Sequence, residues 1–155
     1  SVKSMINRKT LVLGSLVIAL TVISIILGWG IIRKTQLDTS SQIVALETIE
    51  AVLKASDRDA MLLVMSDDNF DAQHKDDYAT RFFNLKRTVG ALQTISRVTG
   101  ASSVPLLPFS TPSTATYQFD LNMLAGPITL TSSLVWTNGN WQFSSFRFAG
   151  DLLLN

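Results

Sequence analysis

An uninterrupted apolar run near the N-terminus constrains this chain more than any other feature. Leu11 to Ile32 is a stretch of 22 residues without a charged side chain. At a helical rise of about 1.5 Å per residue, such a run matches the roughly 30 Å hydrocarbon core of a bilayer. A helix inside a soluble domain is expected to carry a polar face, whereas this run has only isolated hydroxyl side chains. The run predicts a membrane-spanning helix from Leu11 to Ile32, with Trp29 at the level of the headgroups.

A cleaved signal peptide is the alternative interpretation of this run. Its apolar region would be about 7–15 residues long and would end in small residues at the cleavage site. The run here is longer and ends in Ile31-Ile32-Arg33-Lys34, which favours an uncleaved signal anchor. Three basic residues precede the run and two follow it, which favours an N-terminus in the cytoplasm.

These observations predict a single-pass protein of the inner (cytoplasmic) membrane, with its C-terminal domain in the periplasm. We expect a cytoplasmic tail over residues 1–10, a transmembrane helix over 11–32, a linker over 33–41 and an extracytoplasmic domain over 42–155. The lipid bilayer is therefore a predicted partner of the chain.

Charge and composition narrow the function classes of the outer domain. The chain has 13 basic and 12 acidic residues. Residues 1–34 hold five of the basic residues and no acidic one, so the rest of the chain carries eight basic against 12 acidic residues, a formal charge of −4. An acidic domain is a poor nucleic-acid binder. With no Cys and one His, disulfides, thiol chemistry and multi-His metal sites are also disfavoured, so we expect neither a cofactor nor a metal.

The first half of the outer domain has helical periodicity. Apolar residues from Ile43 to Leu53 lie on one helical face, and Ser56-Asp57-Arg58-Asp59 resembles a capping box before a short helix that runs to Val64. A third helix is predicted from about Asp76 to Ile95, with Gly100 as its stop signal. Residues 101–112 hold three of the four prolines and are predicted to be irregular or an edge strand.

The second half alternates as strands do. Three strands are predicted, over 115–123, 128–136 and 141–148, with Asn138-Gly139 as a tight hairpin turn. A two-residue loop at Asn138-Gly139 would place Trp136 opposite Trp141, and one at Ala125-Gly126 would place Met123 opposite Ile128. In the last strand the aromatic residues stand at odd positions before Ser144-Ser145 and at even positions after it. This change predicts a β-bulge at Ser144-Ser145. The predicted core residues of the sheet are Tyr117, Phe119, Leu121, Trp136, Trp141, Phe143, Phe146 and Phe148.

The predicted fold class is α+β, with an N-terminal transmembrane helix followed by a helical layer on a curved antiparallel sheet. Residues 136–148, which read WTNGNWQFSSFRF, close the predicted meander with a Gly, Trp and apolar pattern. Over about residues 40–150, this order of elements and this last hairpin resemble the nuclear-transport-factor-2-like superfamily. The resemblance implies a cone-shaped fold in which a curved sheet wraps a long helix. That superfamily includes isomerases and dehydratases and also many non-catalytic modules, some of them behind a single membrane span.

The residue pattern offers little for catalysis. Asp120 lies on the strand face opposite Tyr117, so alternation points it away from the core, and His74 lies in an acidic loop. The acidic stretch from Asp67 to Asp71 matches the start of a calcium loop, but Ala72 replaces the required Gly and Tyr78 the required Glu. We predict that the chain is not an enzyme and that it has no catalytic residue.

Exposed apolar segments are the remaining candidates for function. They are expected either to form a partner surface or to fold back on the domain; the residues are Val104, Leu106, Leu107, Phe109, Leu152, Leu153 and Leu154. The predicted function is a non-catalytic accessory or scaffolding subunit of a membrane complex, with other membrane-protein subunits as partners. The alternatives are an anchored binding module for an apolar ligand or lipid inside the cone and, third, an anchored isomerase-like or hydrolase-like enzyme.

Overall fold

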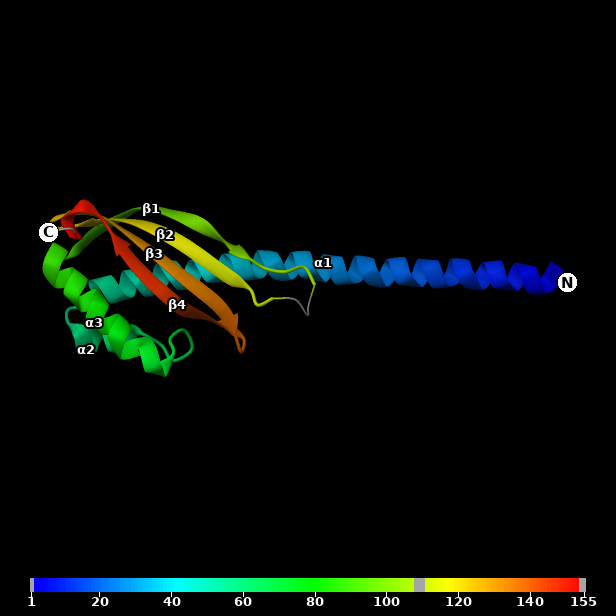
Figure 1. The fold of residues 1–155 in the computed structure, drawn as a ribbon, viewed down its shortest axis with the longest axis horizontal. Helices are drawn as coiled ribbons and strands as arrows, with labels where there is room; N and C mark the ends of the chain where they lie inside the picture. The colour runs from blue at the N-terminus through cyan, green and yellow to red at the C-terminus, as the bar shows by residue number, and fades with distance from the viewer. Residues whose placement is uncertain (1, 108–110, 154–155) are drawn as a thin grey trace.

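The computed structural model describes residues 2–107 and 111–153 and shows an α+β protein with one very long helix. Helix α1 (Val2–Lys54) is followed by α2 (Arg58–Val64) and α3 (Ala72–Val89). Four strands come next, β1 (Leu92–Ser103), β2 (Thr114–Met123), β3 (Gly126–Thr137) and β4 (Asn140–Ala149), and a short 3₁₀ helix η1 (Asp151–Leu153) ends the described chain. The curved sheet packs on the C-terminal half of α1, while the N-terminal half extends away alone (Figure 1).

Helix α1 is continuous from the apolar run into the core of the domain. Its apolar N-terminal part is exposed along its length and is long and apolar enough to cross a membrane. Residues 33–41, expected to form a linker, are helical instead. Their polar side chains are largely exposed, but Leu37 and Ser41 are buried against the sheet. Packing of that one face keeps the polar segment helical.

The short helix α2 begins within the predicted capping box, but one residue later than Ser56, the first residue of that box. Its N-cap is Asp57, whose side chain accepts a hydrogen bond from the backbone N–H of Ala60. An equivalent cap, Asp71, accepts a hydrogen bond from the backbone N–H of Gln73 and opens α3. Helix α3 therefore starts about four residues before the predicted Asp76.

The predicted end of the third helix is wrong. Helix α3 ends at Val89, and Gly90 terminates it with a φ of +81°. Leu92 and Ile95, which fit the helical spacing, belong to strand β1 instead. Strand β1 contains two irregularities of register, between Leu92 and Thr94 and between Ile95 and Arg97. Because these bulges break the two-residue alternation of a strand, they leave an apolar spacing that imitates a helix.

The sheet is an antiparallel meander in the order β1-β2-β3-β4. The Asn138-Gly139 turn has positive φ at both residues and pairs Trp136 with Trp141 and Leu134 with Phe143, as predicted. The predicted bulge is also confirmed, because Ser133 pairs with Ser145 and Leu134 with Phe143, which leaves Ser144 unpaired.

The register of the preceding hairpin differs from the prediction. The turn is formed by Leu124-Ala125, so Met123 pairs with Gly126 and Leu121 with Ile128. The predicted pairing is wrong by two residues. A shift of two keeps every side chain on its face, so the buried face of β2 is the one that alternation predicts.

One hydrophobic core lies between the sheet and the three helices. Helix α1 contacts β1 and β2, and aromatic rings of α3 meet β4 on the same sheet face. Six of the eight residues predicted for the sheet core are buried, and Trp136 and Phe148 are half-buried against it. Rings fill the space between α3 and the sheet: Phe82 and Phe146 have centroids 4.8 Å apart, and Phe70 and Phe143 5.0 Å apart.

Candidate docking edge of the sheet

The two edge strands of the sheet differ in whether other elements hydrogen-bond to their outer backbone groups. The outer edge of β4 is covered by the α2–α3 connection and by α3. The Asn69 side-chain amide donates a hydrogen bond to the Trp141 carbonyl at 2.7 Å, and the Asn69 backbone carbonyl accepts one from the Phe143 backbone N–H at 2.9 Å.

Helix α3 covers the rest of this edge. The Tyr78 hydroxyl donates to the Ser144 carbonyl at 3.1 Å, and the Arg81 guanidinium donates to the Phe146 carbonyl at 2.6 Å. An edge strand whose outward backbone groups are already bonded cannot add a further strand. The edge formed by β4 is therefore closed.

The opposite edge is formed by β1 and is open. Among the described residues, the backbone of β1 hydrogen-bonds only to β2, and no hydrogen bond from a third element to its outer side is found. Two bulges disturb the first half of β1, whereas its last residues, from Arg97 to Ser103, pair with β2 without interruption. Bulges are a common device against unwanted strand pairing. We call the regular stretch 97–103 the docking edge.

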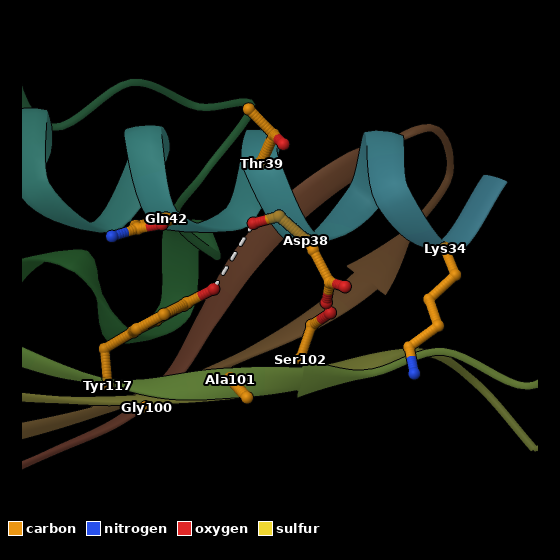
Figure 2. A pocket seen from close by; sticks show the side chains of 8 residues that line it. All are labelled: Lys34, Asp38, Thr39, Gln42, Gly100, Ala101, Ser102 and Tyr117. Carbon is orange, nitrogen blue, oxygen red and sulfur yellow. Dashed lines mark hydrogen bonds between the residues drawn. The ribbon is translucent and has the colours of Figure 1, made fainter. Parts of the chain in front are cut away.

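A groove of about 330 Å³ lies between the docking edge and α1 (Figure 2). Its residues come from α1, β1 and β2: Lys34, Asp38, Thr39, Gln42, Gly100, Ala101, Ser102 and Tyr117. Lys34 and Asp38 supply one charge of each sign on the helix side. Figure 2 shows the Tyr117 side chain rising from the sheet toward the helix at the inner end of the groove.

Tyr117 holds α1 and the sheet together beneath this groove. Its hydroxyl lies 2.6 Å from the hydroxyl of Ser41 and donates a longer hydrogen bond of 3.4 Å to the Asp38 carbonyl. Burial raises the pKa of the Tyr117 phenol, and the hydrogen bond with Ser41 opposes that rise. The phenol therefore stays neutral at physiological pH and acts as a structural contact.

Gly100 lets β1 approach β2 closely at the docking edge. Its φ is +139°, and a Cβ at this position would lie 2.1 Å from the Thr116 carbonyl oxygen. Any other residue would collide with the backbone of β2 and would also be strained in this conformation. The shape of the docking edge thus depends on a glycine.

The structure separates the predicted partner-surface residues into different environments. Val104 is buried, whereas Leu106 and Leu107 are 42% and 60% exposed. Leu152 and Leu153 are half-buried against the core, so these two leucines fold back on the domain. Phe109 and Leu154 lie outside the described residues.

None of the residues weighed for chemistry lines the groove. Asp120 is half-exposed on the outer face of β2, and His74 is exposed with Nδ1 3.1 Å from the Asp71 carboxylate. The pKa of Asp71 is lowered, first by the hydrogen bond from the Gln73 backbone N–H and then by His74. Among the described residues, no three His, Asp or Glu side chains are grouped closely enough to hold a metal ion.

The sequence prediction missed the docking edge because it assigned Leu92 and Ile95 to a helix. A usable signal was present in the same segment. Thr94, Ile95, Val98 and Thr99 are β-branched, and residues of this type favour strands.

Comparison with known proteins gives no match among family models, characterised proteins or solved structures. The resemblance to the nuclear-transport-factor-2-like superfamily therefore stays a prediction.

Proposed function

We propose that this protein is a non-catalytic accessory or scaffolding subunit of a membrane complex. In this proposal the apolar part of α1 anchors the chain in the inner membrane, and the domain docks an extended segment of a partner subunit on the docking edge. The observation that carries the proposal is the contrast between the two edges of the sheet. Four hydrogen bonds from the α2–α3 connection and α3 close the β4 edge, whereas β1 is left open over a regular stretch.

Strand addition explains why an open edge would be retained. An extended peptide gains affinity from main-chain hydrogen bonds to a free strand, and side-chain pockets beside the strand provide specificity. The groove next to residues 97–103 offers such a place, with Lys34 and Asp38 able to pair with charged side chains of the incoming segment. A long uncovered edge without a partner would be an aggregation risk.

The packing of the interior supports this proposal over the alternatives. A ligand-binding cone would need space between α3 and the sheet, where the Phe82 ring instead meets Phe146 and Phe148 at centroid distances of 4.8 and 5.2 Å. An enzyme of the predicted superfamily would need a carboxylate or His on the buried face. The buried polar or charged residues within the described ranges are three serines.

The first test is purification of the full-length protein from its native membranes in mild detergent. We expect it to elute in a complex with at least one other membrane protein, identified by mass spectrometry. Elution as a lone monomer would contradict the proposed subunit role.

A site-specific cross-linking experiment tests the docking edge itself. The photoreactive residue p-benzoylphenylalanine replaces Ala101 on the open edge or, as the matched control, Arg147 on the covered strand β4; both native residues are exposed. We expect a cross-linked adduct with the co-purifying partner from position 101 and not from position 147. Equal adducts from both positions, or adducts from 147 alone, would place the partner elsewhere.

A further inference from the structure

The connection between β1 and β2 lies directly against the apolar part of α1. Val104 is buried just after β1, and the backbone of Leu106 reaches Gly30 of α1. A Cβ on Gly30 would lie 2.6 Å from the Leu106 carbonyl oxygen, a contact that only glycine permits. Figure 1 shows the chain just after β1, residues 104–107, running beside α1 toward the end that bears the N-terminus.

Gly30 lies within the predicted membrane span. It is two residues before Ile32, so at about 1.5 Å per residue it lies roughly 3 Å inside the end of the apolar run. The neighbouring Trp29 is half-exposed, and the Arg33 guanidinium lies 5.7 Å from the centre of its ring. Tryptophan and basic residues are typical of the interface between hydrocarbon and headgroups. The contact with Gly30 brings the backbone of Leu106 to that same level.

Two consecutive leucines are exposed at this level. Leu106 and Leu107 both present apolar surface, and Ile26 and Leu27, one turn before Gly30 on the same helix face, are 36% and 40% exposed. The leucines thus extend the apolar surface of the helix sideways at the depth where the anchor would leave the bilayer. Arg33 and Lys34 follow on α1 and carry the charge that phosphate headgroups attract.

We propose that Leu106 and Leu107 insert into the outer boundary of the lipid bilayer and form a second membrane contact beside the α1 anchor. The occupant of this surface is lipid, because the contact with Gly30 sets the leucines next to a helix face that the anchor would already present to lipid. The contact fixes the rotation of the domain about the α1 axis, since one helix alone leaves that rotation free. This inference rests on the proposed membrane anchoring and not on the docking edge.

The test uses the full-length chain in liposomes of phosphatidylcholine and phosphatidylglycerol, with quencher groups on part of the acyl chains. Because the chain has no Cys, single substitutions give unique sites for an environment-sensitive fluorophore. Leu107→Cys reports on the proposed contact, and Leu106→Cys is a second reporter in case the first disturbs the loop. Leu124→Cys is the matched control, an exposed leucine in the turn at the other end of the sheet, and Ile32→Cys reports on the anchor.

We expect quenching of the label at position 107 to reach at least about half of that at position 32, with a blue-shifted emission. The label at position 124 should be unaffected. Quenching at 32 with the labels at 106 and 107 no more quenched than that at 124 would overturn the second contact and leave the anchor standing. Absence of quenching at 32 would overturn the anchoring and this inference together.

Discussion

The two tyrosines of this chain have equivalent structural roles, each joining a different helix to the sheet. Tyr117 bonds α1 through Ser41, and Tyr78 on α3 donates to the Ser144 carbonyl at the β4 bulge. Burial is the first cause that raises the pKa of each phenol above its ordinary value of 10. Both phenols therefore join a helix to the sheet in their neutral form.

Alkaline pH should weaken the fold through these two residues. A phenol whose pKa is raised by folding holds its proton more tightly in the folded state. Its contribution to stability is therefore complete below pH 10 and is lost as the pH rises through the folded pKa. The near-ultraviolet absorbance of tyrosinate should appear at higher pH in the folded protein than in urea, and Tyr117→Phe should leave only the Tyr78 transition. Identical titration curves for folded and unfolded protein would contradict this expectation.

Single residues also show which local features the sequence made predictable. A helix start within Ser56–Asp59 and the turn at Asn138-Gly139 were recognisable because their conformations depend on the residues themselves and their neighbours. The helix stop at Gly90, in place of the predicted Gly100, was not. Both glycines have positive φ, and what decides between them is that the residues from Leu92 to Thr99, which lie between them, pair with β2.

At the scale of elements, the continuity of α1 is the main departure from the sequence prediction. Residues 33–41 are polar enough to suggest a linker, yet they are helical because one face packs on the sheet. Trp141 donates a hydrogen bond from its indole N–H to Ser40 at 3.0 Å, and Ser41 meets Tyr117. These contacts make α1 a rigid connection between the apolar segment and the domain.

A proline at the start of this segment should break that rigid connection. Thr35→Pro removes a helical hydrogen bond and brings the ring against the Ile31 carbonyl, at a cost of about 3 kcal/mol. With spin labels at Val17→Cys and Leu124→Cys, the distance distribution across the junction should broaden in Thr35→Pro. Thr35→Ala is the control and should stay narrow, since it loses only the side-chain hydrogen bond to Ile31. A distribution equally broad in the control would show that the helix is not rigid there.

The hairpins show which features of a sheet the alternation of apolar and polar residues can predict. Alternation gave the buried face of β2 correctly even though the predicted pairing with β3 was wrong by two residues. A shift of two preserves the faces, so the hydrophobic pattern cannot detect it. The Ser144 bulge was predictable because the apolar residues of this strand stand at odd positions before it and at even positions after it, as Phe146 and Phe148 do. Such a change from odd to even positions can be read directly from the sequence.

At the scale of the whole molecule, the domain has two functionally different ends. The end nearest the apolar half of α1 carries the β1–β2 connection and the Asn138-Gly139 turn. The other end carries the Leu124-Ala125 turn and η1 (Figure 1). The charge is distributed along the same axis, with five basic residues and no acidic one in residues 1–34 and a formal charge of −4 in the rest.

This polarity leads to an expected orientation in the inner membrane. Leu63→Cys, on a residue that is 86% exposed in α2, should react with a membrane-impermeant maleimide added to intact spheroplasts. Asn7→Cys should react only after the membrane is permeabilised, because the basic residues before the span favour the cytoplasm. The reverse labelling pattern would contradict the proposed orientation.

The sequence by itself determined the features that depend on neighbouring residues. These are the long apolar segment, the start of α2, the buried face of β2, the last hairpin and its bulge, all set by local periodicity or by the conformational preference of one or two residues. Tertiary structure decided the helical state of residues 33–41, the strand at Leu92–Ser103 and the closure of one sheet edge. In each of these cases the deciding contact joins residues far apart in the chain, such as Ser41 with Tyr117 or Arg81 with Phe146. Such contacts form only when the elements pack together, so local sequence patterns do not record them.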